Sequence, residues 1–96
     1  MATSAWNVEI LSTAERELDE LPQGVRAEAL QSIDDLREDP FPSDAEPIRG
    51  VRNRYRIRFY RNRYRIIYDV SERQKKIVVD RIRRRDPHTY SGMVRW

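Results

Sequence analysis

Arginine alternates with aromatic and aliphatic residues along two neighbouring stretches of this chain, residues 54–59 (RYRIRF) and 63–68 (RYRIIY). Successive side chains of a β-strand point to opposite faces, so this pattern places arginines on one face and apolar residues on the other. The predicted strands, 53–60 and 63–70, are separated only by Arg61 and Asn62, which suits an antiparallel hairpin. The chain is therefore predicted to contain a sheet with one apolar face and one arginine face.

The charges of the chain are divided between its two halves. Residues 1–48 contain three arginines, no lysine and twelve acidic residues, a net charge of −9, whereas residues 49–96 carry a net charge of +12. A strongly basic half favours a polyanionic partner, and its arginines favour RNA over a membrane. The acidic half either steers RNA towards the basic surface by repulsion or simply keeps its helices soluble.

Length and composition exclude several kinds of protein. Ninety-six residues, of which 39% are hydrophobic, suit one domain spanning residues 1–96 with a modest core. The chain has no cysteine and one histidine, so it can form no disulfide, thiolate site or multi-histidine metal site by itself. No cofactor or metal is expected. No apolar run reaches transmembrane length, so no membrane partner is expected, and the lack of cysteine fits the cytoplasm.

Hydrophobic periodicity predicts the order β-α-α-β-β-β, which is an α+β fold. Residues 6–11 alternate like a short strand, and Ser12 followed by Glu15 has the form of a helix capping box. Two helices follow, and Asp39-Pro40 ends the second. Residues 41–50 are expected to form a loop before strands 53–60, 63–70 and 75–83. Apolar residues at helical spacing mark the buried helix positions, Leu11, Ala14, Leu18 and Leu21, then Val25, Ala29, Ile33 and Leu36. Both helices should pack on the apolar face of an antiparallel sheet.

The arginine face is the candidate functional surface. Strand parity brings Arg56, Arg58 and Arg65 together, although like charges placed side by side destabilise a sheet. Such a cluster therefore indicates an anion partner, and the planar guanidinium fork suits a phosphodiester. The alternative is a solvated face on which Asp69 and Asp80 partly neutralise the arginines. On the last strand, Arg81, Arg83 and Arg85 share a parity.

The same residues carry a family resemblance. The segment Leu11 to Leu36, the motif YRIR at 55–58, the motif YRIIY at 64–68, and Ile82 to Arg85 with Tyr90 resemble toxins of the RelE/ParE superfamily. The resemblance covers nearly the whole chain. It implies a sheet of the microbial-ribonuclease type with two N-terminal helices, and a toxin–antitoxin pair in which a cognate antitoxin wraps and blocks the toxin.

The superfamily contains two activities. RelE-type members cut mRNA in the A site of the 70S ribosome, whereas ParE-type members inhibit DNA gyrase and lack the nuclease residues. The resemblance implies catalytic roles for Arg56 and Arg58 on the first hairpin strand, for Arg65 at the scissile phosphate, and for Tyr90 as a base-stacking residue. Counting from Ile82 assigns the last-strand catalytic arginine to Arg85, and counting back from Tyr90 assigns it to Arg84. Arg85 is preferred because it shares the strand parity of Arg81 and Arg83. RNA-binding roles are expected for the remaining candidates, Arg54, Arg83, Arg84 and His88.

The expected chemistry is a metal-independent endoribonuclease reaction that inhibits translation. Some RelE enzymes have lysines where this chain has Arg56 and Arg58, and arginine cannot readily lose a proton to act as a general base. We therefore expect the arginines to stabilise the charge that develops when a ribose 2′-OH attacks the adjacent phosphate. Arg85 or His88 would help the 5′-oxygen leave. Two alternatives remain open, a gyrase inhibitor without nuclease activity and a non-catalytic RNA-binding module.

Overall fold

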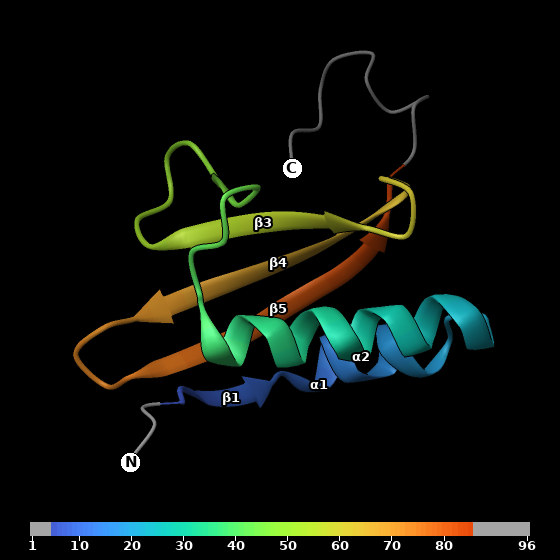
Figure 1. Cartoon of the computed structure of the whole chain (residues 1–96), viewed down its shortest axis with the longest axis horizontal. Helices are drawn as coiled ribbons and strands as arrows, with labels where there is room; N and C mark the ends of the chain where they lie inside the picture. Colours follow the sequence, from blue (N-terminus) through green and yellow to red (C-terminus); the bar gives the residue numbers. More distant parts are fainter. Residues whose placement is uncertain (1–4, 86–96) are drawn as a thin grey trace.

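The structure is a computed structural model and describes residues 5–85. Strand β1 (Asn7–Ile10) precedes two helices, α1 (Ser12–Asp19) and α2 (Gln23–Glu38). Four strands follow, β2 (Glu46–Pro47), β3 (Arg54–Phe59), β4 (Tyr64–Ser71) and β5 (Lys76–Arg84). In Figure 1 the two helices lie side by side against one face of the sheet. The predicted α+β architecture is confirmed.

The five strands form one sheet in the order β1-β5-β4-β3-β2. The three strands predicted from residues 53–83 form an antiparallel meander, with boundaries within one residue of those predicted. Two features differ from the prediction. Strand β1 pairs with β5 in the parallel direction, so the sheet is not wholly antiparallel. Residues 46–47, predicted to lie in a loop, pair with β3 as the short edge strand β2.

The helices bury the residues that their spacing predicted. Ala14 and Leu18 of α1 are buried, as are the four apolar residues that define the stripe of α2. The predicted capping box does not form. Leu11 occupies the N-cap position of α1, and no side chain caps the helix. The helix starts one residue earlier than the capping box required, and its contact with β5 supplies the stability that a cap would otherwise contribute.

The core lies between the helices and one face of the sheet. Strands β3 and β4 contribute Ile57, Phe59, Ile66, Tyr68 and Val70, and β5 contributes Ile77, Val79 and Ile82. Tyr60, which follows β3, is partly buried and also packs against this core. The Tyr60 backbone has a left-handed φ of 54°, which breaks the strand alternation at this position.

A β-bulge in β5 decides which of its side chains reach each face. Tyr68 is paired with Val79 and Ile67 with Arg81, so Asp80 is the extra residue on β5. Without it, Val79 and Arg81 would share a face. With it, Val79 and Ile82 both enter the core, and Arg81 and Arg83 lie on the opposite face beside β4.

Candidate nucleic-acid interface

The sheet face opposite the helices carries a row of three arginines from three strands. Arg58 of β3 is the cross-strand partner of Arg65 on β4, and Arg65 is the partner of Arg83 on β5. Directly paired residues on neighbouring strands lie about 5 Å apart between Cα atoms. We call these three residues the arginine row. A second line of partners, Arg56, Ile67 and Arg81, lies beside it.

Three predicted catalytic residues, Arg56, Arg58 and Arg65, are thus brought together as the parity of the strands indicated. Arg65, at the centre of the arginine row, is only 6% exposed. A guanidinium buried to this extent has lost much of its hydration, so an anion that contacts it gains a strong electrostatic interaction. Ile67 is also buried on this face, between Arg56 and Arg81, whose aliphatic stems can cover it.

Glu46 lies at the β3 end of the arginine row. Its carboxylate accepts a hydrogen bond from Arg56 Nε at 2.9 Å and a longer one from Arg58 Nη2 at 3.3 Å. The hydrogen bond from Arg56, aided by the charges of Arg58 and Arg65, holds the pKa of Glu46 below its ordinary value although desolvation opposes this shift. Glu46 is therefore an ionised carboxylate placed against two of the predicted catalytic arginines.

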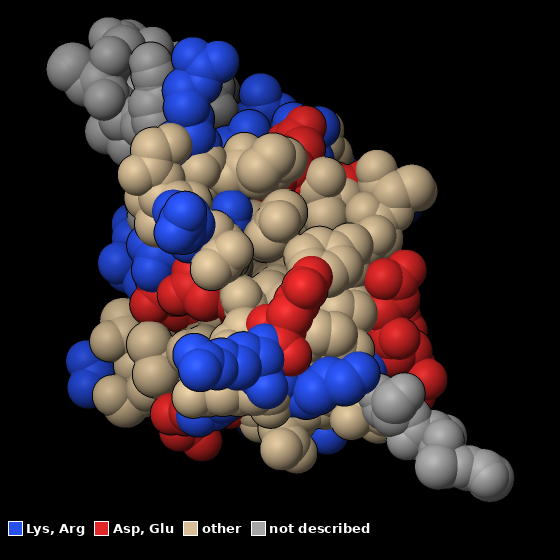
Figure 2. Space-filling model, turned by 90° about the vertical axis from the view of Figure 1, so that its left-hand side faces the viewer, with Lys and Arg blue, Asp and Glu red and all other residues tan. Residues whose placement is uncertain are grey.

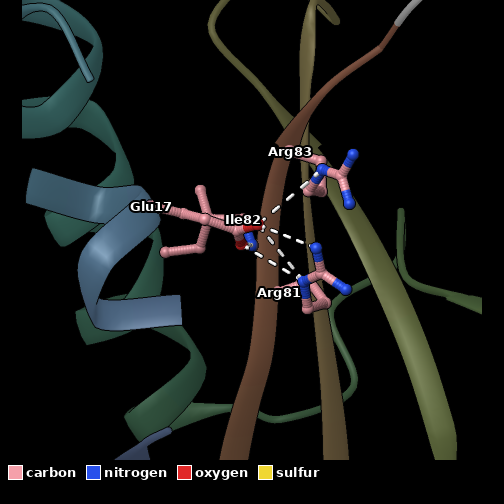
Figure 3. A network of polar contacts seen from close by, with 4 residues as sticks. All are labelled: Glu17, Arg81, Ile82 and Arg83. Carbon is pink, nitrogen blue, oxygen red and sulfur yellow. Dashed lines mark hydrogen bonds and ion pairs between the residues drawn. The ribbon is translucent and has the colours of Figure 1, made fainter. Parts of the chain in front are cut away.

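Glu17 lies at the other end of the arginine row and comes from α1. In Figure 3 its side chain points from the helix towards Arg81, Ile82 and Arg83 of β5. Glu17 Oε2 accepts a hydrogen bond from Arg81 Nη2 at 3.0 Å and lies 3.8 Å from Arg83 Nε. Its other oxygen, Oε1, accepts the backbone N–H of Ile82 at 2.8 Å.

Arg54 was predicted to bind RNA, but its guanidinium is bound within the protein. It forms a two-pronged ion pair with Asp69, at 2.8 and 3.1 Å, and a further contact with Asp80 at 3.1 Å. The hydrogen bond to Asp69 raises the pKa of Arg54 above its ordinary value. Arg54 thus has Asp69 and Asp80 as internal partners, and its predicted role in RNA binding stays a prediction.

The remaining predicted residues lie at or beyond the end of β5. Arg84 is paired with Tyr64 and is exposed, on the face opposite to that of Arg83. Arg85 follows the strand, and its backbone N–H bonds to the Arg63 carbonyl at 2.8 Å. Because residues alternate along an extended backbone, Arg85 rather than Arg84 shares the face of the arginine row. His88 and Tyr90 lie outside the described residues.

Sequence reasoning assigned no site role to Glu17 or to Glu46. Glu17 is 64 residues from Arg81 and Glu46 is 10 residues from Arg56, and no local pattern pairs either glutamate with its arginine. The available signal was indirect. Several arginines on one sheet face require counter-charges, and the acidic residues of the first half of the chain are the source.

Other features of the described chain do not extend this site. A hollow on the surface is lined by Phe41, Asn53, Tyr55, Val70, Ser71, Glu72 and Arg73, none of which was a predicted site residue. Within residues 5–85 no group of three acidic, cysteine or histidine side chains is arranged to hold a metal ion. Neither helix in this range has the length and apolar character needed to cross a membrane.

The comparisons with known proteins agree with this architecture. Residues 8–87 match the family model for the ParE toxin of the parDE type II toxin–antitoxin system. No curated protein sequence matches significantly. The archaeal RelE–RelB complex from Pyrococcus horikoshii OT3 contains a chain that is 27% identical, with a TM-score of 0.74 over 84% of this chain and 96% of that one.

Two further solved structures are similar. One is the toxin–antitoxin complex RelBE2 from Mycobacterium tuberculosis, with 25% identity and a TM-score of 0.70 over 84% of this chain and 92% of that one. The other is a mutant of the E. coli toxin RelE bound to a peptide of the antitoxin RelB, with 22% identity and a TM-score of 0.78 over 95% and 96% of the two chains. The family match spans most of the chain, and the chain therefore belongs to the RelE/ParE superfamily of toxins of type II toxin–antitoxin systems.

Proposed function

We propose that this toxin is a ribosome-dependent endoribonuclease that cuts mRNA in the A site of the 70S ribosome and so inhibits translation in the cytoplasm. The observation that carries the proposal is the arginine row, with Arg56 beside it and Glu46 at its end. The side chains of Arg56, Arg58, Arg65 and Arg83 project from one sheet face, where they can contact the backbone of a single strand of RNA.

In the proposed reaction, bonds and protons are exchanged only between groups of the protein and the RNA. The ribose 2′-oxygen attacks the adjacent phosphorus, the bond from phosphorus to the 5′-oxygen breaks, and a 2′,3′-cyclic phosphate and a 5′-hydroxyl result. Arg56, Arg58 and Arg65 stabilise the negative charge that accumulates on the phosphate oxygens, in place of a metal ion. The ribosome supplies the in-line geometry of the attacking oxygen.

Glu46 is our candidate to accept the proton of the 2′-hydroxyl. It is ionised at neutral pH, and its contacts with Arg56 and Arg58 keep it beside the groups that would hold the phosphate. The proton returned to the 5′-oxygen would come from His88, and Arg85 would stabilise that oxygen as it leaves. Tyr90 would stack on an mRNA base.

The partner proposed to restrain the toxin is a small antitoxin of the RelB kind. Several structurally similar toxins were solved as complexes with such antitoxins. An antitoxin segment that carries carboxylates could cover the arginine row by the same charge-assisted contacts that Glu17 and Glu46 make within the chain.

A second candidate function is inhibition of DNA gyrase without nuclease activity. It is favoured by the family model, which describes a ParE toxin. The arginine row supports the nuclease, because it gathers three arginines from three strands on one sheet face.

Primer extension on a defined mRNA in a reconstituted translation system separates these functions. Cuts within the A-site codon that disappear without ribosomes are the expected result. RNA binding without cleavage would favour the RNA-binding module. Intact mRNA together with inhibited supercoiling by gyrase would overturn the proposal in favour of the second candidate.

A further inference from the structure

Strand β5 extends beyond the strand that covers its outer edge. Pairing between β1 and β5 ends at Ile10 and Val79, but β5 continues to Arg84. Among residues 5–85, β4 is the only sheet neighbour of β5 over these last residues. This segment carries Arg81 and Arg83 and leads to Arg85. An edge strand with a single neighbour is less constrained than a central one.

Glu17 of α1 contacts this edge of β5 from the side of the helices. It is 19% exposed and accepts the Ile82 N–H at 2.8 Å, which is the kind of bond that a neighbouring strand would otherwise provide. A carboxylate acceptor makes this bond stronger than a neutral one. Because α1 packs directly on β5, this contact fixes the distance between the helix and the end of the strand.

The same carboxylate also orients two side chains of the opposite face. Arg81 donates to Glu17 Oε2 through Nη2 at 3.0 Å and Nε at 3.2 Å, and Arg83 Nε lies 3.8 Å from that oxygen. Arg83 is the end member of the arginine row, whose central charge is the buried Arg65. Glu17 therefore offsets the repulsion between Arg83 and Arg65 at one end of the row, while Glu46 contacts Arg58 at the other.

We propose that Glu17 is a positioning residue of the toxin. It holds the end of β5 against α1, and it sets where Arg83, and Arg85 beyond it, are presented to an RNA phosphate. This inference rests on the proposed nuclease function. It extends that function because Glu17, which belongs to the acidic helix α1, orients arginines on the basic face of the sheet.

The test is Glu17→Gln, which keeps an oxygen acceptor for the Ile82 N–H and removes the charge that holds Arg81 and Arg83. Glu20→Gln removes an equal charge from an exposed position three residues along the chain, and it serves as the matched control. We expect kcat for ribosome-dependent cleavage to fall about tenfold to a hundredfold in Glu17→Gln, the scale of a small misplacement of reacting groups. KM should change little, and Glu20→Gln should cleave like the unmodified toxin.

Hydrogen exchange of the Ile82 amide gives a second readout that does not depend on cleavage. We expect faster exchange in Glu17→Gln and unchanged exchange in Glu20→Gln, with both variants folded by circular dichroism. If Glu17→Gln cleaves with an unchanged kcat, the inference is wrong while the nuclease function stands. If the unmodified toxin does not cleave mRNA on ribosomes, the proposed function and this inference both fail. Glu17→Ala should lower kcat further, and equal kcat values for Glu17→Ala and the unmodified toxin would also overturn the inference.

Discussion

Glu46 shows how one residue can couple the electrostatics of the site to the stability of the fold. Its carboxylate joins β2 to the arginines of β3, and its pKa is lowered mainly by the hydrogen bond from Arg56. A carboxyl whose pKa is lower in the folded than in the unfolded chain stabilises the fold when it is ionised in both states. This stabilisation is present above the unfolded pKa and is lost as the pH falls through the folded pKa.

Glu46→Gln should therefore lower the melting temperature at neutral pH, and this effect should disappear once the pH is low enough to protonate the carboxyl in the folded protein. Because Glu46 is partly exposed, the difference at neutral pH should be small. Thermal unfolding measured by circular dichroism across this pH range checks the prediction, with the exposed Glu38→Gln as control. A difference between Glu46→Gln and the unmodified toxin that stays unchanged as the pH falls through the titration of the folded carboxyl would contradict it.

Arg65 carries the charge that matters most for the proposed chemistry. Arg65→Ala should reduce ribosome-dependent cleavage by about a hundredfold to a thousandfold, the effect of removing one group that stabilises transition-state charge. Its burial also means that truncation leaves a gap, so folding of the variant must be checked by circular dichroism. The exposed loop variant Arg52→Ala should cleave normally. Full cleavage by folded Arg65→Ala would exclude Arg65 from the mechanism.

Tyr68 lies on β4, the central strand of the sheet, and forms a hydrogen bond to the segment that leads to β2. Its ring is fully buried, burial raises the pKa of its hydroxyl, and that hydroxyl donates to the Pro40 carbonyl at 2.8 Å. Tyr68→Phe keeps the ring but leaves that carbonyl without this donor, so it should lower the free energy of unfolding by about 1–2 kcal/mol. Urea denaturation measures this loss, and Tyr64→Phe is a half-buried control. An unchanged midpoint would show that the hydrogen bond contributes nothing net.

At the scale of elements, the hairpin between β3 and β4 is closed by an unusual turn. Tyr60, Arg61 and Asn62 all have left-handed backbone angles, with φ between 54° and 66°. The Arg63 N–H bonds to the Tyr60 carbonyl, and Glu28 of α2 accepts the Tyr60 N–H at 2.9 Å. Arg61 and Asn62 thus occupy the central positions of a type I′ turn, for which asparagine followed by glycine is preferred.

Replacing Arg61-Asn62 by Asn-Gly should stabilise the protein by about 0.5–1 kcal/mol, because both new residues adopt positive φ more readily. The gain should appear as a higher urea midpoint with an unchanged m-value. The reverse test is Asn62→Val, since a β-branched residue at positive φ should destabilise the hairpin. A neutral or destabilising Asn-Gly variant would mean that Arg61 or Asn62 makes a compensating contact.

At the scale of the whole molecule, the sheet separates acidic helices from an arginine face. Figure 2 shows a group of acidic side chains along one flank and, elsewhere on that face, patches of basic side chains interspersed with acidic and uncharged residues. The separation of the arginine row from the acidic helices directs a polyanion to one side of the protein. The overall charge of only +3 therefore understates the attraction that RNA would experience at the arginine face.

Binding to single-stranded RNA should weaken steeply with salt. If Arg56, Arg58, Arg65 and Arg83 each contact a phosphate, the plot of log K against log salt should have a slope of about −3, and Arg58→Ala should make it shallower by about 0.7. Fluorescence anisotropy with a labelled oligonucleotide measures both slopes, and Arg16→Ala on α1 is a control that removes an equal charge. A slope near zero would exclude phosphate contacts by this face.

The sequence was sufficient for the fold class, the two helices and the meander, because each depends on a local period that a few neighbouring residues display. The stripe of α2 and the hairpin arginines were placed correctly for this reason. The edge strand β2 was missed because two residues, one of them Pro47, display no period. The capping box was wrong because packing against β5 decides where α1 begins.

The sequence by itself determined that Arg56, Arg58 and Arg65 share a face, since strand parity requires no knowledge of distant partners. The tertiary structure alone decided which side chains of β5 lie on the same face as these three arginines. Parity within β5 would group Val79 with Arg81, and only the bulge at Asp80, which shifts the register against β4, brings Arg81 and Arg83 to the arginine face. The counter-charges were likewise fixed by folding, because Glu17 on α1 meets Arg81 on β5, 64 residues away, and Glu46 on β2 meets Arg56 on β3, 10 residues away, through contacts that no local period records.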